Sequence, residues 1–127
     1  MTLSPISPDA LHLHWEWVRA GLLECRRRGG GHDTPEDIYT MCKSGAAHLY
    51  RLGDYGFSVL QRHKDSDGAV LFILALWCQP RRGTFDEVMG ALDDLARSIG
   101  CVRIRMWSQR NWLRLFKSVS TVYEREV

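Results

Sequence analysis

One run of ten residues, 69–78, constrains the fold of this chain more than any other segment. It reads Ala-Val-Leu-Phe-Ile-Leu-Ala-Leu-Trp-Cys and contains no charged side chain, no glycine and no proline. A half-buried strand alternates apolar and polar residues, whereas this run is apolar at every position. We therefore predict a strand in the middle of a sheet that is covered on both faces.

An amphipathic helix with clear ends follows this strand. Thr84 and Glu87 have the spacing of a capping box, and Gly100 comes after the last turn. The apolar residues between them keep helical spacing: Phe85, Val88, Met89, Leu92, Leu95, Ala96 and Ile99. Residues 102–107 then alternate, with Val102, Ile104 and Met106 predicted to form one buried face. A strand, a helix and a strand in this order predict a right-handed crossover between parallel neighbours.

The N-terminal third predicts two helices. Residues 1–9 form an irregular lead-in or a short edge strand. Residues 10–24 place Leu11, Trp15, Val18 and Leu22 on one helical face, with Trp17 off that face. Residues 34–44 start as Thr-Pro-Glu-Asp, which offers a hydroxyl cap, a proline in the first turn and two carboxylates, and Gly45 ends the helix.

Three strands are predicted after this helical pair, over residues 46–52, 56–62 and 69–78. Their short connecting loops favour an antiparallel meander. We also predict a short helix over about 110–118 and a last strand over 122–127. The predicted fold class is α/β (α+β), with a mixed central sheet that combines the meander and the crossover, and with helices on both faces.

The composition predicts one globular domain over residues 1–127, with 1–9 as lead-in, 10–44 as helical pair and 45–127 as sheet. Of the 127 residues 45% are hydrophobic, and the net charge is +2. No apolar run is long enough for a membrane span, and no signal peptide is recognised. We expect the chain in the cytoplasm or inside a particle assembled there. Four widely spaced cysteines are predicted to be free and buried: Cys25, Cys42, Cys78 and Cys101.

The order of elements resembles that of the GNAT N-acetyltransferases, most clearly over residues 45–127, without a clear first strand or final seventh strand. The residues that carry the resemblance are the apolar strand, the turn Arg81-Arg82-Gly83-Thr84 into the capped helix, and residues 96–101 leading into the next strand. The resemblance implies a notch between the two parallel strands for the pantetheine of acetyl-CoA. It also implies that backbone amides at the helix start hold the pyrophosphate.

The candidate cofactor-binding residues follow from this resemblance: Arg81, Arg82, Gly83, Thr84 and Phe85. A helix N-terminus with two arginines is a favourable anion site. The family pattern, however, has a second glycine where Phe85 stands, and an arginine or glutamine where Pro80 stands. Two alternatives stay open. We favour no bound cofactor, and the alternative is acetyl-CoA.

The catalytic groups of the family are also missing at their usual positions. Residues 69–78 contain no carboxylate to act as base, and the segment around 112–116 contains no tyrosine. Tyr123 is the candidate acid, with core packing as its alternative role. We therefore predict a non-catalytic module that acts through protein contacts, with an active N-acetyltransferase as the alternative. The overall pattern is similar to small acetyltransferase-like proteins of tailed-bacteriophage virion gene clusters, which implies an internal, neck or ejected virion component.

The tryptophans predict where a protein partner binds. Trp17, Trp107 and Trp112 are the candidate interaction surface, because tryptophan is enriched where proteins meet partners. Nucleic acid is the alternative partner, through the basic residues Arg103, Arg105, Arg110, Arg114 and Lys117. No metal site is predicted, because His12 and His14 are two residues apart on a helix and point in different directions.

Overall fold

The computed structural model describes residues 2–27, 33–79, 85–107, 117–119 and 122–127. Its centre is a seven-stranded sheet with the strand order β1-β2-β3-β4-β5-β7-β6, counted over these residues. The strands are β1 (Leu3–Ile6), β2 (His48–Leu52), β3 (Gly56–Asp65), β4 (Gly68–Cys78), β5 (Cys101–Trp107), β6 (Lys117–Val119) and β7 (Val122–Glu126). The β4–β5 pair is parallel and the other pairs are antiparallel, so the sheet is mixed as predicted.

The apolar run lies where its composition placed it. β4 is the middle strand of the sheet, and it pairs with β3 on one side and β5 on the other. The helix α3 (Phe85–Ser98) connects β4 to β5, which confirms the crossover. Gly100 ends this connection with a φ of 78°, a left-handed conformation that glycine adopts without steric cost.

Two further helices precede the meander, after a short 3-10 helix η1 (Pro8–Ala10). They are α1 (Leu11–Arg27) and α2 (Pro35–Ser44). The start of α2 is a complete capping box, in which the Asp37 N–H donates to Thr34 Oγ1 at 3.1 Å and the Thr34 N–H donates to Asp37 Oδ2 at 3.3 Å. Gly45 ends α2 with a φ of 84°. The predicted signals at both ends of this helix are therefore confirmed.

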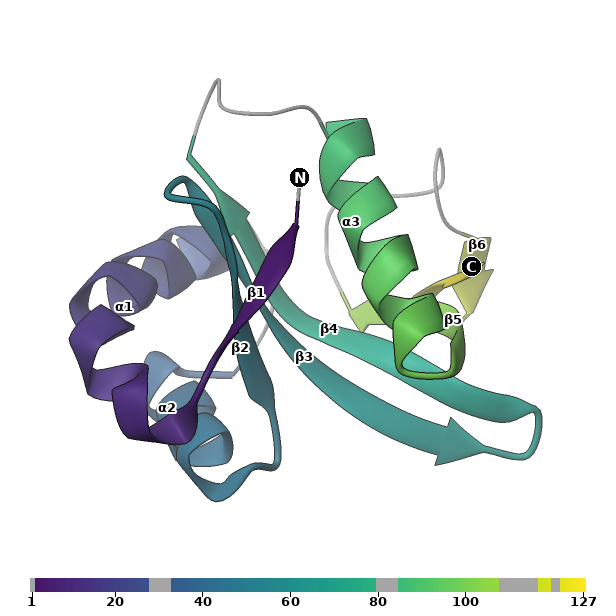
Figure 1. Ribbon diagram of the computed structural model, residues 1–127, viewed down its shortest axis with the longest axis horizontal. Helices are drawn as coiled ribbons and strands as arrows, with labels where there is room; N and C mark the ends of the chain where they lie inside the picture. Colours follow the sequence, from purple (N-terminus) through teal and green to yellow (C-terminus); the bar gives the residue numbers. More distant parts are fainter. Residues whose placement is uncertain (1, 28–32, 80–84, 108–116, 120–121) are drawn as a thin grey trace.

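The helices cover opposite faces of the sheet, with α1 and α2 on one face and α3 on the other (Figure 1). The core consequently has two halves. The α1/α2 half contains Leu11, Val18, Leu22, Ile38, Cys42, Ala47, Leu49, Phe57, Val59 and Ala75. The α3 half includes Leu52, Leu60, Leu71, Ile73, Val88, Met89, Leu92, Ala96, Ile104 and Met106. No helix in the described part of the chain is long and apolar enough to cross a membrane.

The structure corrects the expected ends of the sheet. Residues 3–6 form an edge strand along β2, so the first strand, unclear from the sequence, is present. The helix predicted to reach Ser118 does not do so, because residues 117–119 are β6 and pair with β7. Val119 pairs with Val122 in this register, and both are β-branched residues, which favour extended backbone. The rest of that predicted helix, residues 110–116, lies outside the described residues.

One predicted core position is also wrong. Ile104 and Met106 are buried on the α3 face, but Val102, in the same alternation, is 45% exposed. The side chain of Val102 is instead close to the β3–β4 turn at Gly68. The pairing of β4 with β5 passes from Ala69–Cys101 to Val70–Arg103, which leaves Val102 as an extra residue, while Cys101 before it is buried in the α3 half. Alternation therefore identified the buried face of β5 from Ile104 onward, and the bulge at Val102 interrupts it.

A partly buried ion pair joins α3 to β7. Arg125 Nη2 lies 2.8 Å from Asp93 Oδ2, and the Asp93 side chain is only 13% exposed. The other carboxylate oxygen of Asp93 is buried and has no hydrogen-bond partner among the residues that the structure describes. Burial raises the pKa of the Asp93 carboxyl above its ordinary value of 3.8, against the attraction of Arg125.

This raised pKa predicts a specific pH dependence of stability. Folded Asp93 binds its proton more tightly than Asp93 in the unfolded chain, so its contribution to stability falls as pH rises from 3.8 through the raised pKa. Urea unfolding at a series of pH values should therefore show the wild type losing stability relative to Asp93→Asn across this window. A wild type that gains stability relative to the variant would contradict the expectation.

Candidate functional site

The two parallel strands separate part of the way along the sheet. β4 and β5 pair from Ala69 and Cys101 as far as Ile73 and Met106, and β4 then continues to Cys78. A β-bulge lies at the same place, because Val59 pairs with Ala75 and Leu60 with Ile73, leaving Leu74 as an extra residue. A bulge bends its strand and increases the local twist. β4 and β5 therefore part after residue 73, at the place where the family resemblance implies a notch; this place is called the notch below.

The edge of β4 that faces the notch can be identified from its hydrogen bonds. The Gln79 N–H donates to Tyr55 O at 2.6 Å, and the Ser58 hydroxyl donates to Ala75 O at 2.9 Å. Residues 75, 77 and 79 thus direct their backbone groups toward β3. Because these groups alternate along a strand, Leu76 directs its N–H and C=O toward the notch.

The last turns of α1 meet this edge of β4. The Cys25 thiol donates to Leu76 O at 3.3 Å, and Trp77 Nε1 donates to Glu24 Oε2 at 3.0 Å. Both contacts join residues more than fifty positions apart in the sequence. A backbone acceptor on the notch is therefore already bonded to a side chain of the protein itself.

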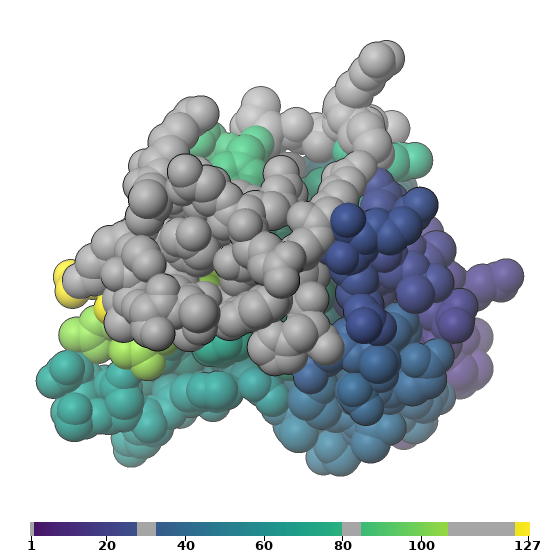
Figure 2. Space-filling model, turned by 180° about the vertical axis from the view of Figure 1, so that it is seen from behind, coloured from purple at the N-terminus to yellow at the C-terminus, as the bar shows by residue number. Residues whose placement is uncertain are grey.

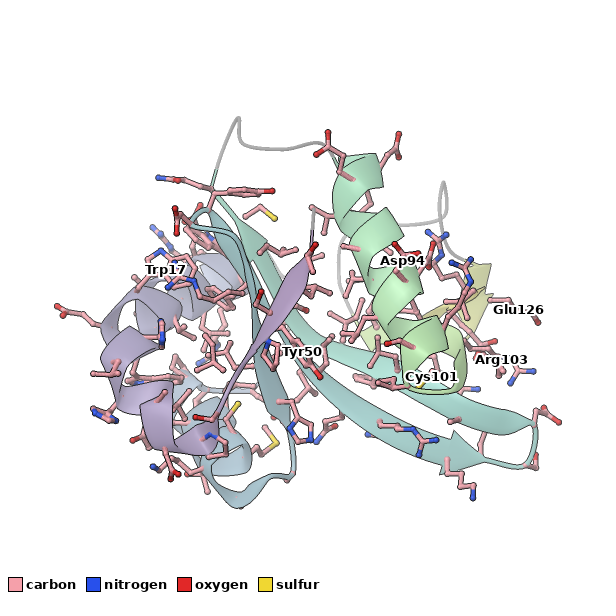
Figure 3. The ribbon with its side chains drawn as sticks, viewed as in Figure 1. Trp17, Tyr50, Asp94, Cys101, Arg103 and Glu126 are labelled. Atoms are coloured by element: carbon pink, nitrogen blue, oxygen red, sulfur yellow. The ribbon has the colours of Figure 1, made fainter. Side chains whose placement is uncertain are left out.

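An aromatic cluster supports the same region from the α1 side. Trp17 packs edge-on against Phe57 and Trp77, with ring centroids 5.5 and 5.7 Å apart. Gly21 lets α1 approach this closely, since a Cβ there would lie 2.5 Å from Phe57 Cε2. The prediction that Trp17 lies off the core face is wrong, because it is half-buried against the core beside β2 and β4 (Figure 3).

Of the predicted cofactor-binding residues, the structure describes only Phe85. It is the first residue of α3 and is 37% exposed. Arg81, Arg82, Gly83 and Thr84 lie outside the described residues. Asp86 and Glu87 follow in the first turn and are exposed. Two acidic side chains in the first turn weaken the attraction of this helix start for an anion.

Neither strand beside the notch carries a catalytic acid or base. The described residues of β4 and β5 include no carboxylate and no tyrosine. Tyr123 lies on β7 opposite Met106, and its side chain is outside the described part of the structure, so its role stays a prediction. Trp107 ends β5 with its side chain likewise not described, and Trp112 lies outside the described residues. The predicted tryptophan surface thus also stays a prediction.

The buried carboxylate nearest to these strands is Glu124 on β7, which is 6% exposed. Its Oε1 is bonded by Arg105 Nε, and its Oε2 lies 3.8 Å from Arg103 Nε. Arg105 Nη2 also lies 3.0 Å from Asp65 Oδ2. The pKa of the Asp65 carboxyl is lowered, first by the hydrogen bond that the Asp67 N–H donates to it and further by the nearby Arg105 guanidinium. Both oxygens of Glu124 therefore serve an ion-pair network, which is a poor arrangement for a general base.

The same network bears on the predicted nucleic-acid contact. Arg103 also lies 3.8 Å from Glu126 and 3.9 Å from Asp67, and Figure 3 shows Arg103 and Glu126 side by side. Two of the five basic residues are thus held by carboxylates. Arg110 and Arg114 lie outside the described residues, and Lys117 is on β6. A phosphate would have to displace these carboxylates to reach Arg103 and Arg105.

All four cysteines are free, as predicted, and three of them are buried. Burial raises the pKa of the Cys42 thiol to about 11, so this thiol stays protonated at neutral pH. Among the described residues, no three histidine, cysteine, aspartate or glutamate side chains are grouped as metal ligands.

The roles of Glu24, Cys25 and Glu124 could not be predicted from the sequence, because all three depend on contacts between distant segments. The one local signal is that Glu24 and Cys25 lie at the end of a helix with a recognisable apolar face.

Comparison of sequences identifies no relative, since no protein-family model and no curated protein matches this chain. Comparison of structures identifies several proteins with a similar fold. An acetyltransferase from Thermus thermophilus matches with a TM-score of 0.65 at 18% identity, over 100% of this chain and 98% of that chain. An acetyltransferase of the GNAT family from Bacteroides thetaiotaomicron matches with a TM-score of 0.60 at 12% identity, over 89% and 64%.

A third match carries a cofactor. N-acetylglutamate synthase from Neisseria gonorrhoeae, solved with coenzyme A and N-acetylglutamate, has a TM-score of 0.62 at 17% identity. It covers 97% of this chain and 34% of that enzyme. At these identities the matches establish the fold and not the activity. Together with the order of strands, the bulge and the notch, they show that this chain has the GNAT acetyltransferase fold.

Proposed function

We propose that this acetyltransferase-like chain is a non-catalytic module that acts through protein contacts. The observation that carries the proposal is the hydrogen bond from Cys25 Sγ to Leu76 O. It takes up a backbone acceptor on the edge of β4 where an extended ligand in the notch would bond. Acetyl-CoA binding would require α1 to give up this contact, and the exposed carboxylates Asp86 and Glu87 disfavour the pyrophosphate.

The surroundings of the notch support the same proposal. The described parts of β4 and β5 provide no residue to accept a proton from an amine, and Glu124 is engaged by two arginines. Without a placed base, the typical 10²- to 10⁴-fold contribution of proton transfer is lost. The similarity to tailed-phage virion proteins, inferred from the sequence, supports a particle or other assembly as the partner.

An active N-acetyltransferase is the second candidate. The bulge at Leu74 favours it, because the notch that this bulge opens is the geometric requirement for pantetheine binding. Retention of a bulged central strand would then reflect selection for the cofactor. The two candidates differ in whether acetyl-CoA binds, which can be measured directly.

Acetyl-CoA at about 1 mM is expected to leave the melting temperature of the chain unchanged. A ligand at 100 times its Kd stabilises the folded state by about 2.7 kcal/mol, which for a chain of this size corresponds to a rise of several degrees. Differential scanning fluorimetry with acetyl-CoA, and with CoA as a non-reactive control, makes the measurement. A rise with both ligands that disappears in Gly83→Asp would contradict the proposal and favour the enzyme.

A further inference from the structure

A groove lies between α1 and α2 on the outer face of the helical layer. It encloses about 650 Å³ and is lined by His12, Trp15, Glu16, Arg19, Glu36, Tyr39 and Thr40. These residues come from the first half of α1 and the first half of α2, whereas the notch involves Glu24 and Cys25 at the other end of α1. The side of the molecule that carries these helices is seen in purple and blue in Figure 2. The groove is therefore separate from the notch.

Two aromatic side chains form the inner corner of the groove. The rings of Trp15 and Tyr39 meet at 4.8 Å with an interplanar angle of 72°. Both are half-buried and pack against the α1/α2 half of the core, so their positions are fixed by the fold. A T-shaped pair turns the edge of one ring onto the face of the other, so a cation can approach the ring face that the neighbouring ring leaves uncovered, where the quadrupole is negative.

The charged residues at the rim add to this attraction. Glu36 Oε1 lies 3.5 Å from Arg19 Nε, and this pair is exposed, at 69% and 49% of the respective side chains. Glu16 is exposed and takes part in no ion pair within the described residues. The rim of the groove thus carries two carboxylates, Glu16 and Glu36, and one guanidinium, Arg19. An incoming cation would find Glu16 available, and it could exchange with Arg19 at Glu36 at little cost, because exposed ion pairs are weak.

The chain already binds one of its own arginines in this way. On the opposite side of α1, the Arg51 guanidinium carbon lies 4.6 Å from the ring centroid of Trp17. Arg51 Nη2 also lies 3.5 Å from Asp54 Oδ1. The guanidinium is also held by His14 Nδ1, 3.0 Å from Arg51 Nη1, and by the Gly53 carbonyl, to which Arg51 Nε donates at 3.1 Å. The groove offers two of these components, an aromatic ring at Trp15 and a carboxylate at Glu16, and no arginine lies over the Trp15 ring in the part of the chain that the structure describes.

We propose that the groove between α1 and α2 binds an arginine or lysine side chain presented by a protein partner. The cation lies against Trp15 and Tyr39, and its charge is balanced by Glu16 and Glu36. This inference rests on the proposed protein-contact function for the nature of the partner. The groove and the notch can nevertheless be tested separately, since acetyl-CoA binding would overturn the proposed function and leave the groove unaffected.

The test uses short blocked peptides on the full ¹⁵N-labelled chain, followed by NMR. The peptides have the form acetyl-Ala-X-Ala-amide, with arginine, lysine or citrulline at X; citrulline matches arginine in shape and lacks its charge. Arginine and lysine are expected to shift the indole N–H of Trp15 and the amides of Tyr39 and Thr40. The citrulline peptide is expected to bind at least about 5-fold more weakly.

Matched variants assign the effect to the groove. Glu16→Gln, at an exposed position, is expected to weaken the arginine peptide about 3- to 10-fold. Asp86→Asn removes one carboxylate from α3 on the other face of the sheet and is expected to leave the affinity unchanged. Equal binding of arginine and citrulline, equal effects of the two variants, or no shifts at about 10 mM peptide would each overturn the proposal.

Discussion

Glu124→Ala is expected to lower the free energy of unfolding by about 3 kcal/mol, the largest effect of any single substitution considered for this chain. Glu124 is almost fully buried and interacts with both Arg103 and Arg105. The side chains of these arginines are themselves only 18% and 29% exposed. Removal of the carboxylate leaves two poorly solvated guanidiniums without their shared partner. Urea unfolding at neutral pH measures the loss.

Glu126→Ala is the matched control for this experiment. Glu126 lies two residues along the same strand and also faces Arg103 at 3.8 Å, but its side chain is 70% exposed. An exposed pair of this kind contributes about 0–1 kcal/mol. The two variants remove the same chemical group from the same network and differ in burial. Equal and small losses for both would show that the network is too well solvated to hold β5 and β7 together.

Gly21→Ala and Gly90→Ala are expected to change stability in opposite directions. Both glycines lie inside helices, where alanine is favoured by about 1 kcal/mol. At Gly90 an added Cβ meets nothing within 4 Å, so the variant should be more stable by about that amount. At Gly21 the Cβ would lie 2.5 Å from Phe57 Cε2 and 3.0 Å from Trp77 Cδ2.

Overpacking of this kind costs about 1–3 kcal/mol, which outweighs the helix propensity that alanine gains at Gly21. Thermal and urea unfolding of the two variants beside the wild type give the comparison. Stabilisation of Gly21→Ala equal to that of Gly90→Ala would mean that Phe57 and Trp77 move freely, and that the aromatic cluster does not fix the distance between α1 and β4.

Most of the fold could be predicted from local sequence, because its elements have strong local signals. The capping box at Thr34, the apolar run of β4 and the helical spacing of α3 each specify one structure. The ends of the sheet were harder. Residues 3–6 include a proline and form a strand only because β2 offers an edge to pair with. The β6 strand likewise forms by pairing with β7, and no local pattern in residues 117–119 predicts it.

The candidate site was predictable only in outline. The notch follows from the crossover, which the sequence indicates, but the bond from Cys25 to Leu76 depends on how α1 lies across β4. Gly21 allows that packing, because a larger residue there would clash with Phe57. In the sequence alone, a glycine within a helix indicates only a weak helix former. The groove could not be predicted for a similar reason. The helical spacing predicts Trp15 in the core, and its position in the groove wall arises only where Tyr39 of α2 meets it.

The extra residue in β4 also decides which side chains belong to which layer. Before Leu74, the odd-numbered residues Leu71 and Ile73 face α3; after it, Leu76 and Cys78 do, and Trp77 faces α1. The strand therefore consists of two halves whose alternation is out of phase. Because every residue of this run is apolar, the strand can change phase without placing a polar side chain in either half of the core. A strand without Leu74 would alternate regularly, with Ile73 facing α3 and Ala75 and Trp77 facing α1, and it would lose the bulge that bends β4 away from β5.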